Sequence, residues 1–401
     1  MNRVTMLTIL MLSVLTPNYV CAQVPADHDS LLLVSDWDFL GPDGDLSGLP
    51  IILKEQHWAE EVHVDEVALR RNGVRLENIR IEHVRTSGVS RQSALRFLLS
   101  THGLGFWSPS GGSVVITTKV IADTYWHDSS SRPSSEMFLN GSLDARRNAV
   151  FMAAFHTIES NDYVDALIAC LQDPDTDLRF NAAYAIAQFG PSGARAAMPL
   201  GITLHLDNLT VRESCAYALG NIGKSGANEL LKILSDSDQS VARMAAKGLR
   251  YVGTPGHDLI PQVVAAALAH GNGRALDNNY VGLLGAFAET VVSLDYGQAE
   301  LIVAPLLETV QPERRVFALI IISYLGARSQ LDVESYIQLL TDDNVYVRRR
   351  AASALLMADK HAIKSVSVLM RATEDADPET RQLARLVAAE IESQTPKAIQ
   401  Q

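Results

Sequence analysis

The sequence contains few cysteines, few aromatic residues and no excess of positive charge. Three cysteines in 401 residues cannot form the dense disulfide framework of a small secreted domain. Aromatic residues make up 6% of the chain, and this low content disfavours a β-sandwich. A formal net charge of −12 argues against a nucleic-acid-binding protein, because binding to phosphates requires a basic surface. The chain is 47% hydrophobic, rich in Ala, Leu and Val, and long enough for two or three domains, which favours helices packed through small residues.

Residues 1–22 have the pattern of an export signal. Arg3 supplies a positive charge, an apolar stretch follows, and Val20 and Ala22 fit the small-residue rule of a signal-peptidase site. The residues before Cys21 make a poor lipobox, which disfavours lipidation at that position. The sequence therefore predicts an exported chain, periplasmic or secreted, that is soluble after cleavage.

The second half of the sequence is periodic. An apolar residue followed by apolar or small residues 4, 5, 8 and 11 positions later recurs along the chain, as in Leu178 with Ala182, Ala183, Ile186 and Phe189. These offsets place all five side chains on one face of a helix. Eight such starts, 30 to 39 residues apart, are Ala145, Leu178, Val211, Val241, Tyr280, Phe317, Val347 and Thr380. A period of this length predicts a solenoid of stacked helix pairs.

Acidic residues and glycines mark the ends of the predicted helices. Asp173 and Asp175 precede one first helix and are suited to cap it, while Phe189 and Gly190 end it. The segments DPDTDLRFNAAYAIAQFG, DNLTVRESCAYALGNIG and DDNVYVRRRAASALLMAD resemble HEAT repeats, in particular the short bacterial kind also found in phycobilin-lyase-like proteins. This resemblance implies a mostly α fold, an α-solenoid of HEAT-like helix pairs, preceded by a small α+β domain.

The HEAT family has an Arg near the start of the first helix of each repeat. Five repeats match that place with Arg146, Arg179, Arg212, Arg348 and Arg381, whereas three depart from it with Ala242, Val281 and Ala318. The family implies that such an Arg ties one repeat to the acidic loop of its neighbour, and we favour this role over a surface for anionic ligands. The cluster of Arg348, Arg349 and Arg350 is the candidate partner-binding site, because three consecutive side chains cannot all point into the stack.

Residues 23–120 predict a small α+β domain. We expect strands over residues 34–39, 62–64 and 79–84, a helix from residue 90 to 103, and a terminal hairpin over residues 104–117. The stretch from residue 62 to 118 resembles the STN-like module, the short N-terminal domain shared by secretins and TonB-dependent receptors. The residues that support this resemblance are Ala94, Leu95, Leu98, Leu99, Gly103, Leu104, Phe106 and Trp107. The resemblance implies protein–protein contacts at the cell envelope and supplies no catalytic residue.

Serines around Pro133 predict a flexible linker that would let the two modules move independently. The predicted organisation is a leader over residues 1–22, an STN-like domain over 23–120, a Ser/Pro linker over 121–140, about eight HEAT-like repeats over 141–395, and a tail over 396–401.

Motifs for catalysis or metal binding are absent from the sequence. It contains no HExxH, CxxC, GxSxG or GxxxxGK[ST] motif. His57 and His63 have no obvious third ligand, and helix capping accounts for acidic pairs such as Asp342 and Asp343. After cleavage two thiols remain, Cys170 and Cys215, which we interpret as core residues rather than a disulfide pair.

Two functional hypotheses follow. The first is a non-enzymatic exported scaffold or adaptor that binds a protein or peptide on the concave solenoid surface, needs no cofactor and binds no nucleic acid, with a cell-envelope association through its N-terminal domain. The alternative is an enzyme or enzyme-assisting, lyase-like HEAT protein with a ligand cavity near residues 250–310. Polar residues converging between helices in that region favour the alternative, whereas an evenly apolar seam favours the scaffold.

Overall fold

The computed structural model divides the chain into two compact units, residues 1–226 and 227–401. It describes residues 34–39, 45–79, 84–108, 113–129, 132–156, 161–252, 257–271, 275–326, 329–331, 333–357 and 366–394. The predicted leader, the predicted tail and most of the strand expected over residues 79–84 lie outside these ranges. Among the described residues, no helix is both long enough and apolar enough to cross a bilayer.

The first unit begins with two small sheets. β1 (Val34–Phe39) pairs antiparallel with β3 (Val84–Ser90). In the other sheet β5 (Ser113–Thr118) lies in the middle, antiparallel to β4 (Leu104–Trp107) and parallel to β2 (Glu61–Val64). The strands expected over residues 34–39 and 62–64 and the terminal hairpin are therefore confirmed.

Four α-helices accompany these strands. They are α2 (Leu49–Glu55), α3 (Glu66–Arg71), α4 (Arg91–Ser100) and α5 (Lys119–Ser129), joined by the short 3-10 turns η2 (Leu46–Gly48) and η3 (Leu76–Asn78). The predicted helix α4 is capped by the Ser90 hydroxyl, which accepts a hydrogen bond from the Ser93 amide. Every residue of α4 is buried, because one side packs on β4 and the other on the repeat helix α8.

Residues 121–129 and 132–140, the described parts of the segment predicted as a flexible linker, are instead ordered. α5 packs on β4, where the Trp126 indole donates to the Phe106 carbonyl at 2.7 Å and the Tyr125 hydroxyl donates to the Ser108 carbonyl at 2.9 Å. A 3-10 turn, η4 (Ser135–Phe138), follows and places Phe138 in the core. Serine content suggested flexibility, but the aromatic side chains have buried partners and outweigh it.

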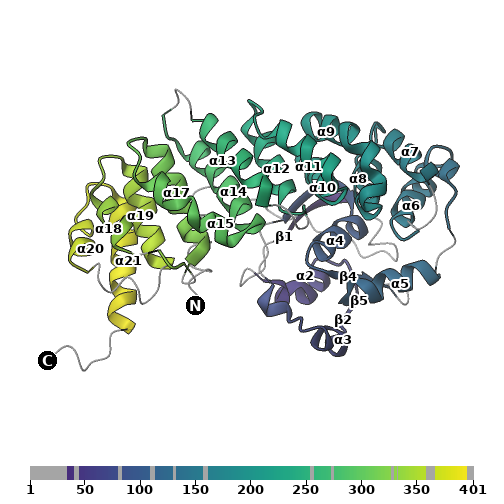
Figure 1. Cartoon of the computed structure of the whole chain (residues 1–401). Coiled ribbons are helices and arrows are strands. Elements are labelled where there is room, and N and C mark those ends of the chain that lie inside the picture. The colour runs from purple at the N-terminus through teal and green to yellow at the C-terminus, as the bar shows by residue number, and fades with distance from the viewer. Residues whose placement is uncertain are drawn as a thin grey trace. The chain divides into compact units, whose positions relative to one another are not determined.

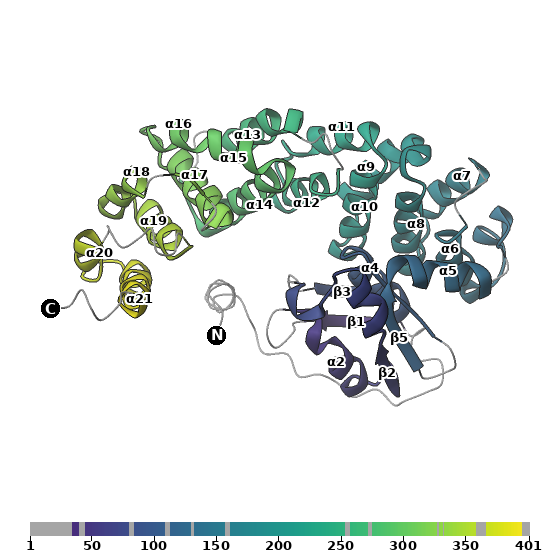
Figure 2. The ribbon, with the colours of Figure 1, turned by 60° about the horizontal axis from the view of Figure 1, so that its bottom comes forward.

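Helix pairs make up the rest of the first unit. The first helices of successive pairs are α6 (Leu143–Ala153), α8 (Thr176–Gln188) and α10 (Leu209–Asn221), which pack side by side (Figure 1). A second layer contains α7 (Asn161–Cys170) and α9 (Ala197–Leu206), with the 3-10 turn η5 (Gly190–Ala196) leading into α9. Figure 2 shows β3 and α4 against the first-helix layer, at α8 and α10.

The second unit repeats the same arrangement after α11 (Lys224–Ile233), which spans the boundary between the units. Its first helices are α12 (Gln239–Leu249), α14 (Asn278–Leu294), α17 (Pro312–Leu325), α19 (Val345–Met357) and α21 (Pro378–Gln394), each packed on the next (Figure 2). The other layer consists of shorter pieces: η6 (His257–Leu259), α13 (Ile260–Ala269), α15 (Tyr296–Leu301), α16 (Val303–Leu307), α18 (Glu334–Ile337), η8 (Gln338–Thr341) and α20 (Val366–Ala372).

All eight predicted repeat starts lie in first helices, so the mostly α fold of HEAT-like helix pairs behind a small α+β region is confirmed. The buried residues of these helices are mainly Ala, Leu, Val and Ile, as the composition suggested. Gly190 and Gly223 have φ angles of 53° and 77° where first helices end, the conformation that glycine adopts most easily.

Candidate functional site

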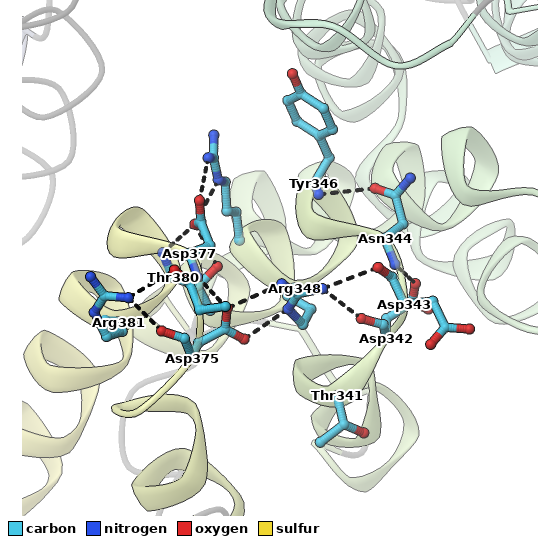
Figure 3. A network of polar contacts seen from close by, with 12 residues as sticks. Thr341, Asp342, Asp343, Asn344, Tyr346, Arg348, Asp375, Asp377, Thr380 and Arg381 are labelled. Atoms are coloured by element: carbon cyan, nitrogen blue, oxygen red, sulfur yellow. Dashed lines mark hydrogen bonds and ion pairs between the residues drawn. The ribbon is translucent and has the colours of Figure 1, made fainter.

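Arg348 in α19 holds two acidic loops of the second unit together. Its Nε donates to Asp375 Oδ2 at 2.8 Å and its Nη2 to Asp375 Oδ1 at 3.1 Å. Its Nη1 donates to the carbonyls of Asp342 and Asp343, at 2.9 and 3.2 Å. Figure 3 shows the guanidinium between the loop before its own helix and the loop before the next first helix. We call this arrangement the Arg–Asp clamp.

The first unit contains the same clamp. Arg179 of α8 donates to both carboxylate oxygens of Asp207 and to the carbonyls of Asp173 and Pro174. Arg146 of α6, in the preceding repeat, likewise pairs with Asp173 in the loop before α8. The role that the family implies for the arginine series, a tie between neighbouring repeats, is therefore observed at these positions.

One clamp residue was missed in the sequence. Arg315 in α17 pairs with Asp342 at 3.0 Å and donates to the Thr309 carbonyl at 2.6 Å, so it takes the place that had been assigned to Ala318. The sequence does contain a signal for this role, because an Asp lies 27 residues after Arg315, as it does after Arg348. In both cases the Arg also donates to the carbonyl of the residue six positions before it.

The other two members of the predicted partner-binding cluster do not turn outward as a group. Arg349 donates to Asp377 through Nε and Nη2, at 2.9 and 2.6 Å, and also pairs with Glu379. Burial lowers the pKa of Arg350, which is the behaviour of a desolvated side chain. The geometry of Arg348 and Arg349 thus favours a role in the stack over a role in binding an external partner.

The clamps alter the acidity of the carboxylates that they hold. Hydrogen bonding to Arg349 lowers the pKa of Asp377 far below its ordinary value, and Asp377 also caps α21 through the Thr380 amide at 2.8 Å. For Asp375 burial acts to raise the pKa, but hydrogen bonds from Arg348 and from the Asp377 amide outweigh it, so the pKa is lowered. These groups remain charged at neutral pH and are suited to structural ion pairs rather than to acid–base catalysis.

A second polar cluster joins the small α+β region to the repeats of the first unit. Arg96 of α4 is 4% exposed, and its guanidinium lies 3.8 Å from the centre of the Phe151 ring and 4.2 Å from that of Tyr184. It donates to the Phe151 carbonyl at 2.7 Å and to Asn181 Oδ1. Burial lowers the pKa of Arg96 to about 10, so the side chain remains a cation at neutral pH.

Aromatic residues surround this cation. The Phe97 ring meets those of Phe180 and Tyr217 edge-on, at centroid distances of 5.3 and 5.6 Å. The β3 backbone also contacts the repeats, since the Ser90 amide donates to Asp177 at 2.8 Å and the Ser87 amide to Thr210 at 2.9 Å. The contact is therefore a packed and hydrogen-bonded interface, not a loose tether.

The remaining chemical candidates are structural or isolated. Cys170 and Cys215 are buried free thiols, as predicted, and burial raises the pKa of Cys170 to about 11. His63 is exposed and pairs with Glu61, while the His57 carbonyl accepts a hydrogen bond from Arg91. Among the residues that the structure describes, no group of three His, Cys, Asp or Glu side chains could hold a metal ion.

An apolar surface on α9 was not anticipated from the sequence. Met198, Ile202 and Leu206 on α9 are 65%, 46% and 76% exposed, and Leu209 beside them, at the start of α10, is 59% exposed. A cleft of about 300 Å³ beside them is lined in part by Ile202, Thr203 and Leu206. The apolar pattern that repeats along the sequence belongs to the first helices of the pairs. It therefore gives no expectation for the exposed face of a second helix such as α9.

Comparison with known proteins agrees with this geometry. Residues 164–193 match the HEAT repeat family model. This stretch contains most of α7, all of α8 and the turn that follows, which is one helix pair together with its Arg–Asp clamp residue Arg179. The STN-like resemblance of the N-terminal region finds no support in the comparisons.

Three solved structures are similar to part of the chain. The CpcE–CpcF complex of phycocyanin lyase from Nostoc sp. is 19% identical, with a TM-score of 0.31, over 65% of this chain and 96% of that one. A HEAT-like repeats protein from the archaeon Thermococcus onnurineus is 13% identical, with a TM-score of 0.34, over 68% and 97%. Kap95p, solved with RanGDP, is 12% identical, with a TM-score of 0.42, over 69% and 41%. None of the curated proteins compared matches the chain.

Proposed function

We propose that the protein is a non-enzymatic scaffold or adaptor that binds a protein partner on its HEAT-like helix pairs. The observation that supports this most directly is the seam between α13 and α14, in the region where the enzyme alternative requires a cavity. Buried residues of this seam are apolar: Ile260, Val263, Ala266, Ala267, Leu284, Phe287, Ala288 and Val291.

Polar groups near this seam already have backbone partners. The Tyr280 hydroxyl donates to the Ala267 carbonyl at 3.2 Å, His270 Nε2 to the Leu234 carbonyl at 2.7 Å, and the Thr290 hydroxyl to the Ala246 carbonyl at 2.8 Å. Each of these groups is directed at a backbone carbonyl rather than at a common space. The arrangement supports the scaffold over a lyase-like enzyme with a ligand site there.

The partner surface that we propose is the first-helix layer of the second unit. In the first unit the corresponding face includes Phe151, Tyr184 and Tyr217, each 33 residues after the last, and the chain's own α4 covers it. In the second unit the equivalent register positions are Lys247, Ala286, Ser323, Ser353 and Leu386. Exposed side chains such as Arg243 border this face, and Tyr324 is 45% exposed. Of these positions Ala286 and Ser323 are small and half-buried, and small residues flanked by longer ones suit the docking of a protein segment.

The export signal and the STN-like resemblance complete the proposal. The mature chain would act outside the cytoplasm, in the periplasm or after secretion, and its N-terminal domain would associate with the cell envelope. Amino-terminal sequencing of the protein recovered from its native host tests the first point, and we expect the chain to begin at Gln23.

Site-specific photocrosslinking tests the binding role. Benzoylphenylalanine at Tyr324, on the proposed face, is expected to give a discrete protein adduct in living cells. The matched control is the same residue at Ala265, which is exposed on α13 in the other layer. Adducts of equal yield at both positions, or at neither, would contradict binding on the first-helix face.

A further inference from the structure

The exposed face of α9 contains no carboxylate, Lys or Arg, and its one basic side chain is His205, beside Leu206. Ala197–Leu206 contains no Asp, Glu, Lys or Arg, and Met198, Ile202 and Leu206 are spaced four residues apart, so they form one apolar stripe on the helix. The other second-layer helix of this unit, α7, instead exposes Asp165 and Ala169. A contiguous apolar stripe on a soluble surface indicates a contact site rather than a solvated face.

Ion pairs within the same unit border both ends of the stripe. Before Met198, Arg195 pairs with Asp165 at 2.8 Å. After Leu206, Asp207 is held by Arg179 at 2.9 Å. The stripe and its borders therefore bring little net charge to a contact, although the chain as a whole has a formal charge of −12. This is a surface on which two copies of an acidic chain can meet without strong repulsion.

The order of side chains on the stripe is symmetric about its centre. Met198 and Leu206 lie four residues before and after Ile202, and they are similar in size. A two-fold axis through Ile202 would place two antiparallel α9 helices with Ile202 against Ile202 and Met198 against Leu206. A two-fold contact requires the same patch on both subunits to be self-complementary, and this stripe meets that requirement. We infer that α9 pairs with α9 of a second copy of this chain.

The size of the stripe determines the strength of the pairing. Four partly exposed side chains, with Leu209 as the fourth, provide less than the ~800 Å² that each partner buries in a standard interface. The dimer is therefore expected to be reversible, with a Kd of about 1–100 μM. A helix from a different protein could also cover a patch of this size, so the experiments must separate these two occupants.

Cysteine crosslinking of the purified mature chain tests the geometry. Ile202→Cys is expected to form a disulfide-linked dimer on mild oxidation, because the axis brings the two residue-202 positions together. Met198→Cys alone is expected to stay monomeric, whereas a mixture of Met198→Cys and Leu206→Cys chains crosslinks. The native Cys170 and Cys215 are buried and do not compete. Equal crosslinking of Met198→Cys alone and Ile202→Cys would overturn the antiparallel arrangement.

Sedimentation as a function of concentration tests the association itself. Wild-type protein is expected to shift from monomer to dimer across the micromolar range, and Ile202→Glu or Leu206→Glu to raise the Kd at least 10-fold. The matched control is Leu301→Glu, because Leu301 is 69% exposed but lies on α15. Unchanged dimerisation in both stripe variants would overturn the inference. A wild-type chain that remains monomeric at all concentrations would also overturn it. In that case, a different protein that is captured only when the stripe is intact would be the occupant.

Discussion

Arg348 and Asp375 lie 27 residues apart and form a two-pronged ion pair, with N···O distances of 2.8 and 3.1 Å. The same guanidinium donates to the Asp342 carbonyl, six residues before it. One side chain therefore fixes the distance between two successive inter-repeat loops. Because the pair is mostly shielded from water, with both side chains less than a fifth exposed, it contributes more than a surface ion pair does.

Arg348→Ala is therefore expected to destabilise the protein. The change removes two hydrogen bonds to the Asp375 carboxylate and two to the Asp342 and Asp343 carbonyls, and it leaves Asp375 without its cation. The free energy of unfolding should therefore fall by about 2–3 kcal/mol. Urea denaturation followed by circular dichroism measures this loss.

Arg381→Ala is the matched control for that variant. Arg381 donates to the carbonyls of Asp375 and Ala376 in the same way as Arg348 does to those of Asp342 and Asp343, but no carboxylate bond to it is present among the described residues. Its loss should cost about 1 kcal/mol. Equal costs for the two variants would show that the carboxylate bond adds nothing to the clamp.

Stability is expected to fall in acid because of the clamped carboxylates. Asp375 and Asp377 have a lowered pKa in the folded state, so the unfolded chain takes up protons first as the pH decreases. Their contribution is complete above about pH 4, the ordinary pKa of Asp, and is lost as the pH falls below it. Thermal melts from pH 6 to pH 2 should show this decline, and Asp377→Asn should make it shallower.

Asp177 is expected to have the opposite effect on how stability changes with pH. Burial raises the pKa of Asp177, so the folded state holds its proton more tightly than the unfolded state does. This group opposes the acid-induced loss, and Asp177→Asn should make the decline with falling pH steeper. A shallower decline in Asp177→Asn would contradict this assignment.

The repeat architecture could be predicted because its causes are local and recur. Helix periodicity, capping Asp residues and terminal glycines all follow from the sequence near each position, and Asp175, Asp238 and Gly223 perform these roles in the structure. Arg315 was missed because the apolar pattern alone defines the start of its repeat at Phe317. That pattern puts Ala318 at the clamp position, although Arg315 is the residue that pairs with Asp342.

The contact between the small α+β region and the repeats could not be predicted in this way. It depends on residues far apart in the sequence, such as Arg96 and Asn181, whose types are individually unremarkable. The apolar stripe on α9 was missed for a different reason. Helical periodicity shows that apolar residues share a face, but Ile202 is exposed only because Leu200 and Leu204 already fill the buried side.

Arg96→Ala is expected to weaken the contact between α4 and the repeats. The variant leaves the Phe151 carbonyl and Asn181 without their donor and removes a cation from two aromatic rings, so the loss should be about 3–5 kcal/mol. Hydrogen exchange should become faster in α4 and at the start of α8.

Arg91→Ala serves as the control on the same helix. Arg91 lies over the Trp58 ring at 5.4 Å and donates to the His57 carbonyl, contacts that lie entirely within the α+β region. Its loss should cost about 1 kcal/mol and leave hydrogen exchange in α8 unchanged. Faster exchange in α8 on this substitution would show that the contact is not specific to Arg96.

Gly226 is required where a second helix starts against the first helix of its pair. A Cβ placed on Gly226 would overlap the Leu219 carbonyl oxygen, a backbone atom that cannot move aside. Gly226→Ala should therefore cost about 2–3 kcal/mol despite the better helix propensity of Ala.

Gly285, inside α14, gives the opposite expectation, because a Cβ there meets no atom within 4 Å and Ala restricts the unfolded chain. Gly285→Ala should raise the free energy of unfolding by about 0.5–1 kcal/mol. Denaturant midpoints of the two variants distinguish these effects, and a stabilising Gly226→Ala would mean that the two helices do not approach as closely as the structure shows.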